Sequence, residues 1–222
     1  MKRIPYIIVI TISFVLVSCQ SNGQSAKNKK ETTENLIPVQ VPSVDGLERA
    51  YFASGCFWCV EAIYESVKGV KESISGYSGG HTENPTYEAS NTGRTGHAEA
   101  VEIYYDPSIV SFETLVDVYF GSQNVTQING QGPDHGSQYR SIIFYQNKEQ
   151  KEIIEEKKEA LSKKLNKRIA AEILPFQKFW KGEAYHQDYE KRNPNNPYIR
   201  NVSIPRLKKF QAKFPELIKE NH

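Results

Sequence analysis

Short apolar strands alternate with amphipathic helices between residues 47 and 222, and this mixture is the feature that most limits the fold. In residues 98–105, for example, apolar side chains recur at every second position, as they do in a strand with a buried face. Two long stretches, residues 81–97 and 121–138, carry the Gly and Pro residues that are typical of ordered loops. We predict a single α+β or α/β domain, a two-layer sandwich whose long loops gather at one end.

Spacing and cap residues give the expected bounds of these elements. Ser111 is a good N-cap for one helix, and Asn147 with Gln150 forms a capping-box start for another. We expect the tail from Asn193, which holds four prolines, to be irregular apart from one short helix near residues 206–214. The expected strands are 50–53, 71–77, 98–105, 140–145 and 169–174, and the expected helices are 57–67, 111–120 and 147–166.

The N-terminus has the features of a bacterial lipoprotein signal. Lys2 and Arg3 precede an apolar stretch, residues 7–16, that is too short to span a bilayer. Small residues then lead to Cys19, which resembles the lipidated cysteine of a lipobox. The resemblance implies cleavage before Cys19, its acylation, and a lipid anchor on the extracytoplasmic side of a membrane of the bacterial cell envelope. An unmodified cysteine after a plain signal peptide is the alternative.

The composition changes after Cys19. Residues 20–43 are mostly Ser, Asn, Gln, Lys, Glu and Thr, which bury too little apolar surface to offset the entropy of ordering. We therefore expect a signal peptide at residues 1–18, a flexible tether at 19–46 and one folded domain at 47–222. The net charge of +2, without a dense stripe of Lys and Arg, gives no reason to expect a nucleic-acid partner.

Cys56 and Cys59 are the remaining thiols, because the chain has three cysteines in all. A structural zinc site would need four ligands, and the five histidines are scattered. A structural disulfide across so short a loop would add little stability. We favour redox chemistry. Gly55 turns the chain out of a strand, so Cys56 begins a helix whose N-terminus favours its thiolate, and Cys59 lies one turn along.

This spacing leaves the substrate open. A thioredoxin-type disulfide oxidoreductase has the same pattern of two cysteines three residues apart. Phe57 and Trp58, between the thiols, could pack in a core or form the wall of a pocket for a small apolar group. A non-enzymatic lipoprotein that binds a ligand in an aromatic pocket is a further alternative.

Five stretches of the sequence resemble those of a known family. In chain order they are GCFWC, GYSGGHTENPTYE, TGHAEAVEIYYDP, QGPDHGSQYRS and AYHQDY. Together they resemble the peptide methionine sulfoxide reductases of the A type over residues 49–205. The resemblance implies a ferredoxin-like fold, with a mixed sheet flanked by helices. It also implies reduction of methionine-S-sulfoxide, free or in proteins, without a metal or a bound organic cofactor.

The functional residues of the family carry over to matching positions. The resemblance implies that Cys56 is the nucleophile that attacks the sulfoxide sulfur and that Glu99 is the acid near the sulfoxide oxygen. Tyr87 and Tyr139 match two hydroxyl groups that polarise this oxygen. The matching substrate-binding residues are Phe57 and Trp58, for the methyl group, and Asp134, for the backbone.

The resemblance also leads to a role for Cys59. Many relatives keep resolving cysteines near the C-terminus, where this chain has none. Cys59 is then the thiol that condenses with the Cys56 sulfenic acid to a disulfide, and a thioredoxin-like donor reopens it. We expect a monomer that repairs oxidised methionines in envelope proteins. Tyr185 and His186 match a family motif and are expected to support the structure.

Overall fold

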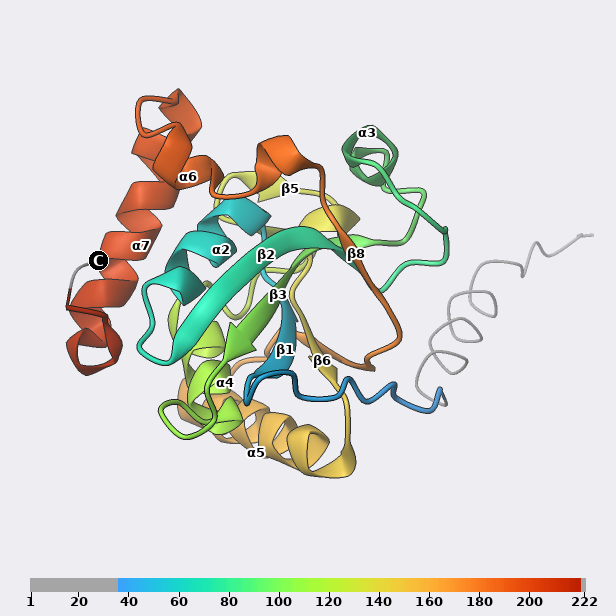
Figure 1. Ribbon diagram of the computed structural model, residues 1–222, viewed down its shortest axis with the longest axis vertical. Helices are drawn as coiled ribbons and strands as arrows, with labels where there is room; N and C mark the ends of the chain where they lie inside the picture. The colour runs from blue at the N-terminus through green and yellow to red at the C-terminus, as the bar shows by residue number, and fades with distance from the viewer. Residues whose placement is uncertain (1–35, 221–222) are drawn as a thin grey trace, which may run out of the picture. The chain divides into compact units, whose positions relative to one another are not determined.

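A six-stranded sheet lies at the centre of the part of the chain that the computed structural model describes, residues 36–220 (Figure 1). The predicted signal peptide, Cys19 and most of the predicted tether lie outside these residues. The strands have the order β7-β6-β1-β3-β2-β8, and a separate hairpin joins β4 to β5. The bounds are β1 Glu48–Ala53, β2 Val70–Ser78, β3 Ala98–Tyr105, β4 Gly130–Gln131, β5 Asp134–His135, β6 Ile142–Tyr145, β7 Glu172–Pro175 and β8 Phe179–Lys181.

Six α-helices and several short helical turns accompany the sheet in the described residues. The helices are α2 Phe57–Glu65, α3 Tyr87–Asn91, α4 Phe112–Gly121, α5 Lys148–Leu165, α6 Tyr189–Arg192 and α7 Ile204–Lys213. The 3₁₀ turns are Ser137–Tyr139, Ala184–His186 and Pro215–Leu217, and a π-helical turn spans Ile199–Ser203.

β1, β2, β3 and β6 form the ferredoxin-like part of the sheet. α2 connects β1 to β2, α4 lies between β3 and β6, and the pairs β1–β3, β2–β3 and β1–β6 are antiparallel. α5 then leads from β6 to β7, which pairs with β6 in parallel, so the sheet is mixed. This confirms the predicted α+β fold with a mixed sheet flanked by helices.

The two faces of the sheet are covered by different parts of the chain. On one face the larger apolar core joins Phe52 of β1 to Tyr64 of α2 and Leu115 of α4. On the other face Tyr51 stacks on Phe176, with ring centroids 3.7 Å apart. Phe176 lies outside the helices and strands, so extended chain covers part of this second face, whereas α2, α4 and α5 pack on the first.

The predicted helix starts are confirmed. The Ser111 side chain accepts a hydrogen bond from the Thr114 N–H at 3.0 Å, and that of Asn147 accepts one from the Gln150 N–H at 2.9 Å. Each bond satisfies a backbone donor that the first turn of a helix would leave free, and each fixes the start of α4 or α5.

The C-terminal tail corrects one prediction. From Asn193 onwards the chain is more regular than its prolines suggest, because a π-helical turn leads directly into α7. Pro205 lies in the first turn of α7, the part of a helix where proline is tolerated best. The short helix expected near residues 206–214 is therefore confirmed, and the prediction of an irregular tail around it is wrong.

Residues 36–46, which we expected to belong to the tether, contact the domain. The Val39 N–H donates to the Phe176 carbonyl oxygen at 2.8 Å, and the Val41 N–H donates to Gln146 Oε1 at 2.8 Å. These bonds fix the course of the chain before β1. In residues 36–220 the structure contains no helix with the length and apolar character needed to cross a bilayer.

Candidate active site

Cys56 lies at the end of the sheet where the long loops gather, as the sequence predicts. It follows β1 and is the N-cap of α2. Gly55 makes the turn between them with φ +77°, and a Cβ at this position would lie 2.5 Å from Gln131 Cβ. Glycine is therefore required here both by the backbone and by the close approach of the 121–138 loop.

The two thiols of α2 are buried and differ in acidity. Cys56 is 6% exposed and Cys59 is 2% exposed, and neither forms a disulfide. Burial raises the pKa of Cys56, and its hydrogen bond with Cys59 raises it further. The same hydrogen bond lowers the pKa of Cys59. Burial and this hydrogen bond thus act against the predicted stabilisation of a Cys56 thiolate by the helix N-terminus.

Glu99 lies at the start of α2 and is held there by the backbone. Its Oε2 accepts a hydrogen bond from the Phe57 N–H at 3.0 Å. The residue is 2% exposed, and burial raises the pKa of its carboxyl group to about 8, although the Phe57 N–H lowers it. At neutral pH the carboxyl group is thus mainly protonated, and an acid of this kind can donate a proton in a site that excludes water.

An aromatic wall surrounds the first turn of α2. The ring of Phe57 lies 4.8 Å from that of His186 and 6.4 Å from that of Tyr87, between centroids. Trp58 stacks on Tyr189 with centroids 3.7 Å apart, and its Nε1 donates to His186 Nδ1 at 3.2 Å. Phe57 and Trp58 thus lie beside the thiols in fixed orientations, as the wall of a small apolar pocket requires.

Tyr87, at the start of α3, and Tyr139, at the end of a 3₁₀ turn, reach the same end of the sheet. The Tyr139 hydroxyl donates to Asn91 Oδ1 at 3.5 Å, and the side chain of Tyr87 also interacts with Asn91. Burial raises the pKa of Tyr139, and the proximity of Glu99 raises it further. Both phenols are half-buried and remain protonated, so both can act as hydrogen-bond donors.

Asp134 is connected to the thiols through a tyrosine that the sequence did not reveal. The Tyr198 hydroxyl donates to Asp134 Oδ2 at 2.5 Å and lies 3.8 Å from Cys59 Sγ. Tyr198 follows the first two prolines of the tail, in a stretch without a recognised motif. His186 and Tyr189 do belong to a quoted motif, AYHQDY, so a sequence signal for them existed. The structure thus brings all the predicted residues except Cys19, which lies outside the described range, to one end of the sheet.

Tyr185 and His186 differ in their surroundings. Tyr185 is 51% exposed, whereas His186 is 1% exposed and contacts Phe57, Trp58 and Tyr87. His186 therefore supports the aromatic wall directly.

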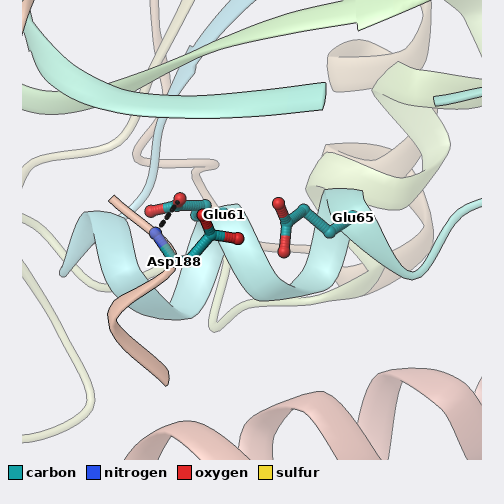
Figure 2. Close-up of side chains that lie close together, drawn as sticks. All are labelled: Glu61, Glu65 and Asp188. Carbon is teal, nitrogen blue, oxygen red and sulfur yellow. Dashed lines mark hydrogen bonds between the residues drawn. The ribbon is translucent and has the colours of Figure 1, made fainter. Parts of the chain in front are cut away.

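Three acidic side chains next to the site form the one group in residues 36–220 that could share a cation. Figure 2 shows Glu61 and Glu65 extending from α2 beside Asp188, whose N–H donates to Glu61 at 2.7 Å. Ser75 donates a second hydrogen bond to Glu61, and Lys191 lies 3.8 Å from the Asp188 carboxylate. The hydrogen bond from Asp188 to Glu61 connects α2 to the segment that carries His186.

Two thiols one helical turn apart, next to a protonated carboxyl group and an aromatic wall, define the class of protein as a thiol-dependent oxidoreductase. Comparisons with known proteins are more specific. The family model of peptide methionine sulfoxide reductases matches residues 48–218. The chain therefore belongs to the peptide methionine sulfoxide reductase family, and it is an enzyme that reduces methionine sulfoxide.

Individual relatives agree with this assignment. The chain is 46% identical over 172 residues to peptide methionine sulfoxide reductase MsrA of Pasteurella multocida, a match that covers 78% of this chain and 99% of the relative. It is 46% identical to that of Saccharolobus solfataricus, over 78% of this chain and 98% of the relative.

Solved structures show the same fold. Methionine sulfoxide reductase A of Corynebacterium diphtheriae superposes with a TM-score of 0.61 at 33% identity, over 73% of this chain and 87% of that chain. Reduced Mxr1 from Saccharomyces cerevisiae superposes with a TM-score of 0.63 at 28% identity, over 70% and 91% of the two chains.

Proposed function

We propose that the enzyme reduces the S epimer of methionine sulfoxide, free and in proteins, with Cys56 as nucleophile and Cys59 as resolving thiol. The observation that carries the proposal is the buried Glu99 carboxyl group, held at the start of α2 by the Phe57 N–H. Sulfoxide oxygen is a poor leaving group until it is protonated, and a carboxyl group with a pKa of about 8 retains the necessary proton at neutral pH.

The first step transfers oxygen from the substrate to Cys56. The Cys56 sulfur attacks the sulfoxide sulfur while Glu99 protonates the sulfoxide oxygen, and the Tyr87 and Tyr139 hydroxyl groups donate hydrogen bonds to it. The attack forms a transient S–S bond. The S–O bond of the substrate and this S–S bond then break, the hydroxyl oxygen bonds to the Cys56 sulfur, and methionine leaves. Cys56 is oxidised by two electrons to a sulfenic acid, and the substrate is reduced by the same two electrons.

The substrate is held by groups on both sides of the thiol. The methyl group contacts Phe57 and Trp58, whose rings His186 and Tyr189 hold in place. The side chain of Asp134, which accepts a hydrogen bond from Tyr198, contacts the substrate backbone. The preference for the S epimer follows from placing the methyl group and the oxygen against different walls, in agreement with the family motif.

The second step regenerates the enzyme through Cys59. Its sulfur attacks the Cys56 sulfenic acid, a disulfide forms, and the hydroxyl group leaves as water. A thioredoxin-like dithiol then reduces the disulfide. From the lipobox-like sequence before Cys19 we also propose that the enzyme acts on oxidised proteins of the bacterial cell envelope as a lipid-anchored monomer, with a signal peptide at residues 1–18. The tether that follows is shorter than the expected 19–46, because Val39 and Val41 already bind the reductase domain.

Turnover on each epimer, with dithiothreitol and with a thioredoxin system, tests the proposal. We expect activity on the S epimer alone, and no methionine from Cys56→Ser. Cys59→Ser is the matched control: it releases methionine once, accumulates sulfenic acid and does not cycle with thioredoxin. Equal activity on both epimers, or full thioredoxin-driven turnover without Cys59, would contradict the proposal. Disulfide exchange that does not depend on Glu99 would indicate the thioredoxin-type alternative.

A further inference from the structure

The surroundings of Cys59 come largely from a segment near the C-terminus, residues 198–206. The Tyr198 hydroxyl lies 3.8 Å from the Cys59 sulfur. Ser203, at the end of the π-helical turn, donates a hydrogen bond from its hydroxyl to Glu190 and also lowers the pKa of Cys59, as does the charge of the Arg206 guanidinium in α7. Three side chains of one continuous segment therefore influence the same thiol.

Arg206 is held by three hydrogen bonds to uncharged oxygens. Its Nη1 donates to the Ser54 carbonyl oxygen at 2.9 Å and its Nη2 donates to Ser54 Oγ at 2.8 Å. Its Nε donates to the Ser122 carbonyl oxygen at 2.9 Å. These acceptors fix the plane of the guanidinium but do not neutralise its charge, so the positive charge acts on the groups nearby.

The guanidinium lies against the turn that carries the reactive thiols. Ser54 is two residues before Cys56, and a Cβ added at Gly55 would lie 3.6 Å from Arg206 Nη1. α7 itself packs on α2, which places the guanidinium of Arg206 beside the buried first turn of that helix. Because both thiols are buried, solvent screens the effect of this charge on them less than it would at the surface.

The other titratable groups around Cys59 stabilise its thiolate less than Arg206 does. Burial raises the pKa of Glu99 to about 8 and the pKa of Tyr198 above its ordinary value, so both groups are mainly uncharged at neutral pH. Asp134 is hydrogen-bonded to Tyr198. Apart from the hydrogen bond with Cys56, Arg206 is the strongest of the influences that lower the pKa of Cys59.

We propose that Arg206 is a positioning residue for the second step of the cycle, because its charge holds Cys59 as the thiolate that attacks the Cys56 sulfenic acid. The inference rests on the proposed function of Cys59. In this step the Cys59–Cys56 S–S bond forms, the S–O bond of the sulfenic acid breaks, and the departing hydroxide takes a proton to become water. Cys59 is oxidised and the Cys56 sulfur is reduced.

Arg206→Met and Arg206→Lys separate the charge from the size of the side chain. One equivalent of methionine-S-sulfoxide is mixed with each reduced enzyme between about pH 5 and pH 9, a range that spans the titration of an activated and of an ordinary thiol. Acid quenching then stops the reaction at successive times. Mass spectrometry separates the sulfenic acid, which has gained an oxygen, from the disulfide, and chromatography measures the methionine released. Arg200→Met, at an exposed arginine of the adjacent π-helical turn, is the matched control.

We expect the Met variant to release methionine at the wild-type rate but to form the disulfide more slowly. The pH midpoint of disulfide formation should rise, and below it the rate should fall about three- to tenfold, because a less acidic thiol forms less thiolate while each thiolate attacks somewhat faster. The Lys variant should keep a midpoint near that of the wild type, and the Arg200 control should be unchanged.

Three results would overturn the inference. An unshifted midpoint in the Met variant, or the same shift in the Lys variant, would show that the charge is not the cause. Equal slowing of methionine release and disulfide formation would indicate that Arg206 merely supports the turn at Ser54. Failure of the wild type to release methionine in the first turnover would instead refute the proposed function, and this inference with it.

Discussion

Glu99 illustrates how a single residue acquires an unusual proton affinity from its position. On a strand with one exposed face it would be an ordinary ionised carboxylate. Here β3 buries it behind α2, where it is 2% exposed and receives one backbone hydrogen bond, from Phe57. One hydrogen bond does not offset the loss of water around a charge, so the protonated form prevails near neutral pH.

The pH dependence of the first step follows from this acid. The wild-type rate of methionine release should fall above about pH 8, where Glu99 loses its proton. Glu99→Gln cannot ionise, so it should be slower by about 10²-fold or more and should keep rising with pH as the Cys56 thiol ionises. Single-turnover methionine release across the pH range measures both profiles. A decline in the Gln variant at the same pH as in the wild type would rule out Glu99 as its source.

At the residue scale, the sequence predicts those site residues that lie within a local motif. Cys56, Glu99 and Tyr139 lie within the motifs from which they were predicted. Tyr198 and Arg206 reach the thiols through the packing of α7 and its π-helical turn on α2, a contact between parts of the chain about 140 residues apart that no local spacing encodes. The ionisation of the cysteine pair also depends on these distant groups, because Tyr198 and Arg206 both lower the pKa of Cys59.

At the scale of elements, successive turns of α2 carry buried side chains with different roles. Its first turn carries the thiols, and its second carries Glu61, which is 2% exposed and accepts hydrogen bonds from Ser75 and the Asp188 N–H. Burial raises the pKa of Glu61 to about 7, partly offset by these hydrogen bonds. A carboxyl group whose folded pKa exceeds its unfolded value stabilises the fold less as pH rises from the unfolded to the folded pKa.

Glu61→Gln should therefore flatten the pH dependence of stability. The free energy of unfolding of the wild type should fall by roughly 2 kcal/mol more than that of the variant between about pH 5 and pH 7, because the Gln side chain has no proton to lose. Urea unfolding at several pH values measures the difference. The control is Glu83→Gln, at an exposed loop position. Parallel curves for wild type and Glu61→Gln would contradict the role of this carboxyl group.

Elements with a sustained pattern were predicted well, and the shortest were not. β3 and α5 agree with the predicted strand and helix to within a residue at each end, because alternation or a cap residue defines them. α3, the β4–β5 hairpin and β8 are too short for a periodicity to emerge, and β8 exists because it pairs with β2 at the edge of the sheet. Pairing between distant strands, rather than a local sequence pattern, therefore determines an element as short as β8.

For the whole molecule, the described chain enters the domain far from the thiols. β1 runs from Glu48 toward Cys56, so the residues before it lie at the other end of the sheet. Val39 and Val41 bind Phe176 and Gln146, which follow the ends of β7 and β6 on that same side. The N-terminal segment and the site therefore lie at opposite ends of the sheet.

The proposed anchor is tested by Cys19→Ala in a bacterial host. We expect the wild-type chain in the membrane fraction, with a mature N-terminus at an acylated Cys19, and the variant in the soluble fraction with undiminished methionine release, because several acyl chains are needed for stable anchoring. Cys59→Ala, which leaves the lipobox intact, should remain in the membrane fraction. An unmodified Cys19 in the mature wild-type protein, by mass spectrometry, would refute the anchor.

The separation of entry point and thiols has a consequence for large substrates. A domain held by the chain that precedes β1 presents its loops, Cys56 and the aromatic wall at the opposite end of the sheet from that chain. A damaged protein as large as the enzyme itself could then dock over the thiols without contacting whatever surface holds the enzyme.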